Sequence, residues 1–288
     1  MKKLHRLIAA ILLAAMLFLG ATGCSERGEN DEEMKKKVLL ILIDGMRPDA
    51  LLNTEYAEKL STDSAYTFSA RTVYPSITLP CHISLFYSKA PDIHGVLDNN
   101  YTPTDKLGRG ICELLANDGK TSAMFYNWTE LKYLTTKDST KQTLINGAEA
   151  GWLESGTALA DACIEHCKNT PTDFTFLYFG LVDEMGHKYG WLSEEYYSAL
   201  NASLAEVERV IDALGDEYSI ILTADHGGHD HGHGSELDED MTIPVFVFDE
   251  KYPKGKELFC VSILDIAPTV LKLLGTATDA DWQGKVIE

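Results

Sequence analysis

Basic residues are scarce in this chain of 288 residues. Lysine and arginine together number 25, against 44 aspartates and glutamates, which gives a formal net charge of −19 at pH 7. The resulting negative field repels phosphates, so it disfavours nucleic acid polymers and anionic lipid surfaces as general partners. A small phosphorylated substrate is still compatible with this charge where metal ions reverse its sign locally.

Cysteine is too scarce for a disulfide framework. Five cysteines follow Cys24, and an odd number leaves at least one of them without a partner in the chain. Two of the five, Cys163 and Cys167, stand four residues apart on an expected helix with His166 between them. Packing inside a helix interface explains this spacing better than metal binding does. We therefore assign these cysteines no functional role.

The sequence also lacks an apolar run of about 20 residues, the length that spans a bilayer. Its N-terminal run, Leu7–Leu19, has 13 residues, follows three basic residues and precedes the small residues before Cys24. These features are typical of a secretory signal. The segment resembles the bacterial lipoprotein signal, with Ala21 where leucine is commoner, and this likeness implies lipidation at Cys24. An uncleaved membrane anchor is the alternative, and either interpretation predicts an extracytoplasmic protein.

Residues 1–24 are thus expected to be a lipoprotein signal peptide, and their removal, with three basic residues, leaves a net charge of −22. Residues 25–37 are charged and lack an apolar period, which indicates a flexible tether. No internal repeat or change of composition divides the remainder. We expect one α/β domain over residues 38–288, with 45% hydrophobic residues in the chain as ample material for its core.

Short apolar runs of strand length alternate with helical patterns in this domain. Strands are expected over residues 38–43, 121–126, 173–180, 219–222 and 241–248. Pro244 indicates an edge or irregular position for the last of these strands. Helices are expected to start near Pro48 and to cover residues 79–86, 157–167, 194–214 and 262–275.

The strand at 219–222 leads into a cluster of potential metal ligands. They are Asp225, His226, His229, His231 and His233. Open α/β sheets bind ligands at the carboxyl ends of their strands. Carboxylate oxygen and imidazole nitrogen suit zinc, without excluding manganese or iron. The alternative is a histidine-rich surface loop that binds metal adventitiously.

Two other strands end in a similar way. Asp44 follows the strand at 38–43, and Asp183 follows the strand at 173–180 with His187 four residues later. A helical backbone would place Asp183 and His187 on one face. Taken singly, Asp44 could cap the helix near Pro48, and the other pair could be an exposed polar loop. One shared sheet edge explains all three aspartates better than three separate coincidences.

Thr78 precedes the helical pattern at 79–86, and Pro80 fits the first turn of that helix. Thr78 is either the N-cap or a nucleophile at a helix N-terminus, where free amides and the helix dipole favour an anionic phosphoryl group. In the turn-rich stretch at 90–100, Asn99 and Asn100 are either turn residues or donors to a substrate oxygen.

Together these motifs resemble the alkaline phosphatase superfamily. They are DG at 44–45, PSITLPCH around Thr78, DEMGH from Asp183, DHG from Asp225 and GHG around His233. Because threonine stands before the helix, the nucleotide pyrophosphatase/phosphodiesterase branch is the most similar one. The likeness covers nearly all of residues 38–275. It implies a three-layer α/β/α sandwich with a mostly parallel central sheet.

The resemblance also implies two divalent metal ions, most simply zinc, and a ligand set. Asp183, His187 and His233 would hold one ion, and Asp44, Asp225, His226 and the Thr78 oxygen would hold the other. Asn99 matches the residue that donates to a phosphate oxygen in the family. The resemblance favours His233 over His229 and His231, because a Thr-Ile-Pro strand follows it, with Pro244 eleven residues later, as in related members.

We therefore expect a lipid-anchored, extracytoplasmic, metal-dependent phosphohydrolase that cleaves phosphodiester or pyrophosphate bonds in small substrates such as nucleotides, through phospho-Thr78. A metal lowers the pKa of a hydroxyl that is otherwise protonated near neutrality. Only six residues, 227–232, separate His226 from His233, fewer than is usual in that branch. Phosphomonoesterase, phosphonate hydrolase and phosphoethanolamine transferase activities stay open. A non-catalytic zinc-binding lipoprotein would leave Thr78 and the dispersed aspartates unexplained.

Overall fold

The computed structural model describes residues 37–136 and 138–288. The signal peptide expected at 1–24 and all of the expected tether except Lys37 lie outside the described residues. None of the helices in the described ranges combines the length and the apolarity needed to span a bilayer.

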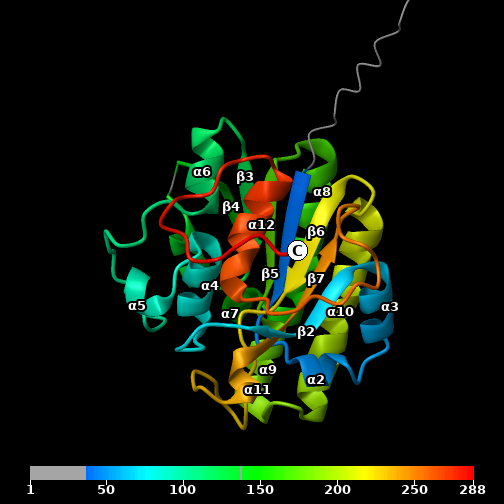
Figure 1. Ribbon diagram of the computed structural model, residues 1–288. Helices are drawn as coiled ribbons and strands as arrows, with labels where there is room; N and C mark the ends of the chain where they lie inside the picture. The colour runs from blue at the N-terminus through cyan, green and yellow to red at the C-terminus, as the bar shows by residue number, and fades with distance from the viewer. Residues whose placement is uncertain (1–36, 137) are drawn as a thin grey trace, which may run out of the picture. The chain divides into compact units, whose positions relative to one another are not determined.

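Within the described residues, seven strands form one sheet in the order β2-β7-β6-β1-β5-β3-β4 (Figure 1). The strands are β1 (Lys37–Ile43), β2 (Ala65–Arg71), β3 (Ser122–Tyr126), β4 (Lys141–Leu144), β5 (Phe174–Phe179), β6 (Tyr218–Thr223) and β7 (Thr242–Phe248). β1 pairs in parallel with both β5 and β6, and β3 pairs in parallel with β4 and β5. β7 runs antiparallel to both of its neighbours, β6 and β2. The expected mostly parallel sheet is confirmed.

The helices lie on both faces of this sheet, as the predicted three-layer arrangement requires. Helices α4, α6 and α12 lie on one face, and α8 and α10 lie on the other (Figure 1). The α-helices are α2 (Pro48–Leu51), α3 (Tyr56–Asp63), α4 (Thr78–Tyr87), α5 (Pro91–His94), α6 (Ile111–Asn117), α7 (Gly147–Ala150), α8 (Trp152–Asn169), α9 (Leu181–Tyr189), α10 (Glu194–Leu214), α11 (Asp238–Met241) and α12 (Ile266–Leu273). Two 3₁₀ turns, η1 (Thr129–Leu134) and η2 (Ile263–Asp265), complete the set.

Burial on both faces explains why the central strands are apolar along their whole length. Every residue of β5 and β6 is buried, and so is every residue of β1 after Lys37. Parallel strands covered by helices on both sides have no solvent face and therefore need no polar alternation. The three strands that carry the predicted ligands are thus the core of the sheet.

The expectation of an edge position for β7 is wrong, because β7 lies between β2 and β6. The expectation of an irregularity at Pro244 is right. The register with β2 shifts between Thr67 and Ala70, which pair with Val245 and Ile243, so an extra residue of β2 lies opposite Pro244. A bulge accommodates a residue that has no N–H for the ladder.

Candidate metal centre

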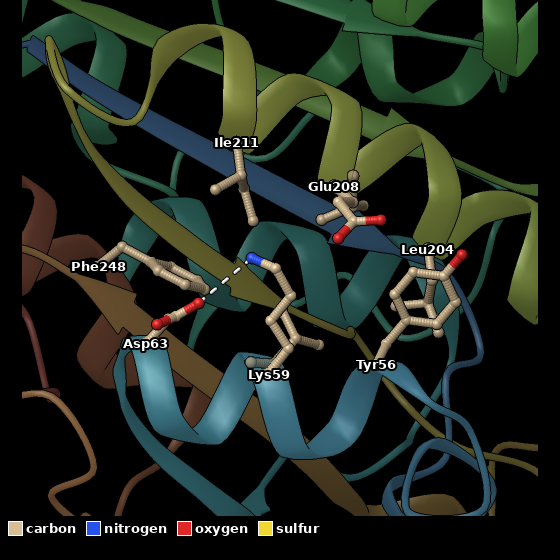
Figure 2. Close-up of a pocket in the computed structure, with 9 residues that line it drawn as sticks. Tyr56, Lys59, Asp63, Leu204, Glu208, Ile211 and Phe248 are labelled. Carbon is tan, nitrogen blue, oxygen red and sulfur yellow. Dashed lines mark hydrogen bonds and ion pairs between the residues drawn. The ribbon is translucent and has the colours of Figure 1, made fainter.

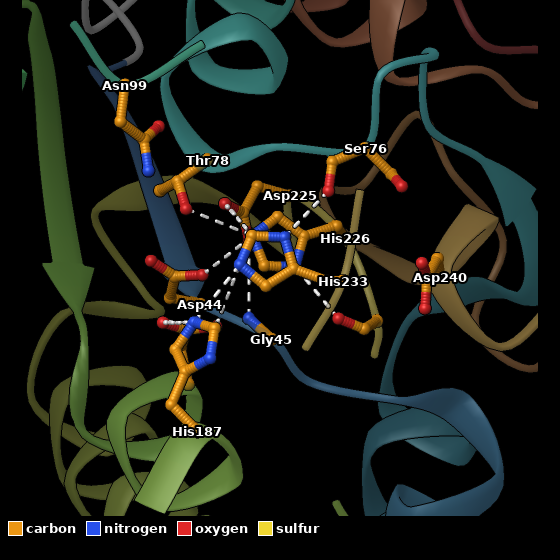
Figure 3. Close-up of polar contacts among 12 residues, drawn as sticks. Asp44, Gly45, Ser76, Thr78, Asn99, His187, Asp225, His226, His233 and Asp240 are labelled. Carbon is orange, nitrogen blue, oxygen red and sulfur yellow. Dashed lines mark hydrogen bonds and ion pairs between the residues drawn. The ribbon is translucent and has the colours of Figure 1, made fainter. Parts of the chain in front are cut away.

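The side chains predicted to bind metal meet at the carboxyl ends of the central strands (Figure 3). Asp44 directly follows β1, Asp183 lies in the first turn of α9 just after β5, and Asp225 follows β6 closely. Since β1 lies between β5 and β6 and pairs in parallel with both, the three carboxylates arrive at the same edge.

Asp183, His187 and His233 form one group of potential ligands. His187 Nε2 lies 3.4 Å from Asp183 Oδ2, across one turn of α9, and 3.2 Å from His233 Nε2. His233 Nε2 lies 3.7 Å from Asp183 Oδ1. Ligand atoms held tetrahedrally at about 2.0–2.1 Å from zinc lie roughly 3.3–3.5 Å apart. The spacing of this group therefore suits one zinc ion.

Asp44, Thr78, Asp225 and His226 form the second group, which is centred on one imidazole nitrogen. His226 Nε2 lies 3.3 Å from Asp44 Oδ1, 3.2 Å from Asp225 Oδ2 and 3.2 Å from Thr78 Oγ1. The rings of His226 and His233 stack with their centroids 3.8 Å apart. The two groups are therefore neighbours, and the ligand atoms of Asp44, Asp225 and His226 lie within 4.8 Å of one another, close enough to hold one ion.

Three buried carboxylate oxygens in these groups have no hydrogen-bond partner among the described residues. They are Asp44 Oδ1, Asp183 Oδ1 and Asp225 Oδ2. Leaving a buried acceptor unsatisfied costs about 1–3 kcal/mol, and more when it is charged. Three such oxygens in one place call for a common partner, which a cation provides. The residues present thus fit two divalent ions.

Burial shifts the pKa values in the cluster towards the neutral forms. It raises the pKa of all three carboxyl groups, and repulsion from Asp225 adds to the rise at Asp44 and Asp183. Burial lowers the pKa of His226 to about 4 and that of His233 to about 3. Both histidines are therefore neutral near pH 7, in the form that binds metal. A cation bound between the carboxylates would favour their ionised forms and offset this effect of burial.

Gly45 explains how β1 ends so close to α9. Its φ is +67°, and a Cβ at this position would lie 3.1 Å from the Cα of Asp183. Glycine avoids both the strained backbone and this close contact. The Gly45 amide donates to Asp225 Oδ1 at 3.2 Å, and its carbonyl accepts from the Tyr196 hydroxyl at 2.8 Å and from Trp191 Nε1 at 3.2 Å. The turn at Gly45 therefore packs against Asp183 and hydrogen-bonds Asp225, which places both residues next to the end of β1.

The structure places His233 in the cluster and gives His229 and His231 other contacts. Nδ1 of His233 donates to the Ser76 carbonyl at 2.8 Å, which leaves Nε2 as the nitrogen available to a metal. His229 Nδ1 lies 2.7 Å from Oδ1 of the buried Asp240, while His231 Nδ1 lies 3.1 Å from the backbone oxygen of His187. The sequence-based choice of His233 agrees with this geometry.

Thr78 is the first residue of α4, but it does not cap the helix. The N-cap residue is Ile77, and the Thr78 hydroxyl contacts His226 instead. Asn99 Oδ1 accepts from the Leu79 amide at 3.0 Å. The amide nitrogen of Asn99 points towards Thr78 (Figure 3), where it is available to a substrate oxygen. The capping interpretation of Thr78 is therefore wrong, and its hydroxyl faces the second ligand group through its contact with His226.

Sequence reasoning missed the residues that support the ligands. The buried Tyr178 hydroxyl donates to Asp44 Oδ2. Asp240 Oδ2 accepts from the Ser235 amide at 2.8 Å and from the Ser235 hydroxyl at 2.7 Å. Burial tends to raise the pKa of Asp240, but hydrogen bonds from His229 and Ser235 outweigh it and lower that pKa. The hydrogen bond to Asp240 raises the pKa of His229 in turn.

A separate groove lies between α3 and α10 beside Phe248 of β7 (Figure 2). Its walls are largely apolar, and a Lys59–Asp63 ion pair of 3.2 Å lies along one side. None of the residues predicted to bind metal or substrate lines this groove. Those residues lie together at the candidate metal centre instead.

Comparisons with known proteins identify sequence relatives. The profile of the type I phosphodiesterase / nucleotide pyrophosphatase family matches residues 38–242. Ectonucleotide pyrophosphatase/phosphodiesterase family member 7 of Rattus norvegicus is 25% identical over 83% of this chain and 60% of its own length. Bis(5'-adenosyl)-triphosphatase ENPP4 of Bos taurus is 24% identical over 75% of this chain and 52% of its own length. The chain spans only about half to three fifths of these curated relatives.

Solved structures show the same fold at lower sequence identity. Murine ectonucleotide pyrophosphatase/phosphodiesterase 5, as an inactive threonine-to-alanine variant in complex with AMP, superposes with a TM-score of 0.74 at 14% identity. The match covers 88% of this chain and 100% of that one. The phosphonate monoester hydrolase of Agrobacterium radiobacter has a TM-score of 0.70 at 17% identity, over 87% of this chain and 76% of its own.

Proposed function

The chain belongs to the type I phosphodiesterase / nucleotide pyrophosphatase family, and we propose that it is a two-metal phosphohydrolase that cleaves phosphodiester or pyrophosphate bonds through a phospho-threonine intermediate. One observation carries this proposal. The Thr78 hydroxyl, at the N-terminus of a helix, lies 3.2 Å from His226 Nε2. It therefore shares a ligand group with two carboxylates, each of which has one buried oxygen without a hydrogen-bond partner among the described residues.

In this proposal Asp183, His187 and His233 hold one divalent ion, and Asp44, Asp225 and His226 hold the other together with the Thr78 oxygen. We propose zinc for both, on the basis of the nitrogen and oxygen ligands and their spacing. When bound, the ions supply positive charge that lowers the pKa of the attacking hydroxyl and offsets the charge of the phosphate. Two neutral histidines in the cluster need no deprotonation before they bind.

The reaction consists of two successive exchanges at phosphorus, with Thr78 as the nucleophile in the first and as the leaving group in the second. First Thr78 Oγ1 gives up its proton to solvent and bonds to phosphorus, while the bond from phosphorus to the leaving oxygen breaks and that oxygen takes up a proton from solvent. Water then attacks the phosphorus of phospho-Thr78, releasing the phosphorylated product and restoring the hydroxyl. The Asn99 amide donates to a non-bridging phosphate oxygen, and the positive end of the α4 dipole favours the same anion.

The relatives support a small substrate. The curated relatives are named as a nucleotide pyrophosphatase/phosphodiesterase and as a bis(5'-adenosyl)-triphosphatase. The inactive murine variant carries alanine in place of a threonine and binds AMP. By this similarity we propose nucleotides or other small phosphodiesters as substrates. The net charge of −19 argues against nucleic acid polymers.

The test compares Thr78→Ala with wild type as purified full-length proteins loaded with zinc. Hydrolysis of bis-p-nitrophenyl phosphate is measured beside that of p-nitrophenyl phosphate. We expect wild type to prefer the diester, and Thr78→Ala to lose at least about 10³-fold in kcat while the zinc at Asp183, His187 and His233 is retained. Thr223→Ala, which removes a buried threonine outside the cluster, is the matched control and should keep its turnover.

Two results would contradict the proposal. Near wild-type turnover by Thr78→Ala would remove Thr78 from the mechanism. Wild type that binds zinc but hydrolyses neither substrate would contradict the assignment as a hydrolase of this class. A preference for the monoester would replace the phosphodiesterase assignment with a phosphomonoesterase.

A further inference from the structure

A buried histidine outside the predicted ligand set lies directly beneath the metal centre. His82 is in α4, four residues after Thr78, and is fully buried. Its Nδ1 lies 2.9 Å from the backbone oxygen of Thr78 and 3.4 Å from Asp225 Oδ2. The rings of Tyr178 and Phe176 pack against it in T-shaped arrangements, with centroids 5.3 Å and 6.2 Å away. His82 therefore contacts both the nucleophile residue and a carboxylate of the second ligand group.

The hydrogen-bond partners of His82 define where its proton lies. A backbone carbonyl oxygen only accepts, so Nδ1 of His82 carries the hydrogen that it donates to Thr78. Nε2 has no partner among the described residues, so a second hydrogen there would be buried and unsatisfied. The neutral ring with its hydrogen on Nδ1 is the form that this environment accommodates.

The same Nδ1–H also faces Asp225 Oδ2. That oxygen has no hydrogen-bond partner among the described residues and lies 3.4 Å from His82 Nδ1 and 3.2 Å from His226 Nε2, which makes it the metal-facing oxygen of Asp225. The other oxygen of Asp225 accepts from the Gly45 amide. His82 therefore adds a polar contact at Oδ2 to the hydrogen bond that Gly45 makes at Oδ1, and both contacts limit rotation of the carboxylate.

We propose that His82 is a positioning residue that holds the Asp225 carboxylate against the first turn of α4. Through this contact His82 fixes the position of the Thr78 hydroxyl relative to Asp44, Asp225 and His226. The inference rests on the proposed function, since it concerns the ligand group in which Thr78 acts. Partners of metal ligands typically change metal affinity or activity by about 10–100-fold when they are removed.

Two variants of His82 separate positioning from simple packing. The side-chain nitrogen of asparagine is as many bonds from Cα as Nδ1 of histidine, so His82→Asn retains a donor at the position that matters. The nitrogen of glutamine corresponds to Nε2, so His82→Gln moves the donor to the wrong side. His94→Gln is the matched control, because His94 is another fully buried histidine, bonded to Ser84 and distant in role from the ligands.

The measurement is zinc affinity, by competition of the full-length protein with a chromophoric chelator, together with kcat and KM for bis-p-nitrophenyl phosphate. We expect His82→Gln to bind one of its two zinc ions about 10–100-fold more weakly, with a similar loss in kcat and little change in KM. His82→Asn should stay within a few fold of wild type. His94→Gln should keep both zinc affinities even where its Tm falls.

Equal zinc affinities in His82→Asn and His82→Gln, whether both are retained or both are lost, would overturn the inference. If His82→Gln does not fold, His82→Phe takes its place, because phenylalanine fills the same apolar space without a donor. Failure of the proposed function is distinguishable from failure of this inference. It shows in wild type as absent hydrolysis with zinc bound, whereas the inference fails only in the comparison of variants.

Discussion

Removing the metal should destabilise the protein strongly at pH 8, because it leaves buried carboxylates facing one another. The ligand atoms of Asp44 and Asp225 lie within 4.8 Å of each other. At an effective dielectric constant of about 20, two unit charges at this separation repel by about 3.5 kcal/mol. In a domain of this size 1 kcal/mol corresponds to roughly 2–4 °C in Tm. We therefore expect chelation to lower Tm by about 7–14 °C.

The choice of pH 8 isolates the carboxylates. The pKa values of Asp44, Asp183 and Asp225 are raised above their ordinary value of 3.8 in the folded protein. The unfolded chain therefore releases these protons first, and the metal-free protein loses stability as pH rises from about 3.8 through the raised values. His226 and His233, whose pKa values are lowered, cost stability only below about 6.5. At pH 8 they are neutral in both states.

The variant Asp44→Asn should be more stable than wild type without metal and less stable than wild type with metal. It removes one of the repelling charges and keeps an oxygen that accepts from Tyr178, at a loss of about 1 kcal/mol because that acceptor is no longer charged. The metal-free variant should therefore be more stable than metal-free wild type by roughly 2–3 kcal/mol. With zinc present, wild type should be the more stable protein, since it keeps the full ligand set.

The assay is thermal unfolding by circular dichroism at pH 8, with and without a chelator, with zinc content measured on the same samples. A chelated wild type that has lost its zinc but keeps its Tm within about 2 °C would refute the argument. So would a metal-free Asp44→Asn that unfolds below metal-free wild type, because the repulsion between buried carboxylates would then not limit stability.

Two further predictions concern residues around the ligands. Asn99→Asp keeps an acceptor for the α4 backbone but replaces the donor facing Thr78 with negative charge, so kcat for the diester should fall about 10²–10³-fold at unchanged zinc content; unchanged turnover would exclude Asn99 from substrate binding. In the folded protein the pKa of His229 is raised and that of Asp240 is lowered, so their pair contributes full stability between about pH 3.8 and 6.5 and loses it as pH rises through the raised value or falls through the lowered one. The Tm difference between wild type and Asp240→Asn should thus be larger at pH 6 than at pH 9, and a difference independent of pH would contradict this account.

The sheet was predictable where its strands are buried on both faces. β1, β5 and β6 read as continuous apolar runs because helices cover both of their sides. The two strands that sequence reasoning missed, β2 and β4, form the edges of the sheet. β2 mixes buried and exposed residues, and β4, with the sequence KQTL, has no fully buried residue. Their place in the sheet comes from pairing with a neighbour, which local sequence does not record.

The same distinction separates the ligands from the residues that hold them. The predicted ligands lie where apolar strands end, and a polar residue in that position can be recognised from the sequence as a candidate ligand. His82 and Tyr178 lie within apolar stretches and read as ordinary core residues, while Asp240 follows an acidic run that reads as solvated surface. Each becomes informative only when the fold brings it to Asp225, Asp44 or His229.

The short spacing between His226 and His233 also has a physical explanation. The backbone after His226 is fixed by α11, because the Gly227 and Gly228 amides donate to the carbonyls of Asp240 and Glu239, each at 2.9 Å. Asp240 then holds the returning chain through Ser235. The loop therefore returns to the candidate metal centre within seven residues of His226. A shorter connection changes the surface around the centre more than the centre itself, so we expect the departure to affect substrate preference while leaving the metal content at two ions.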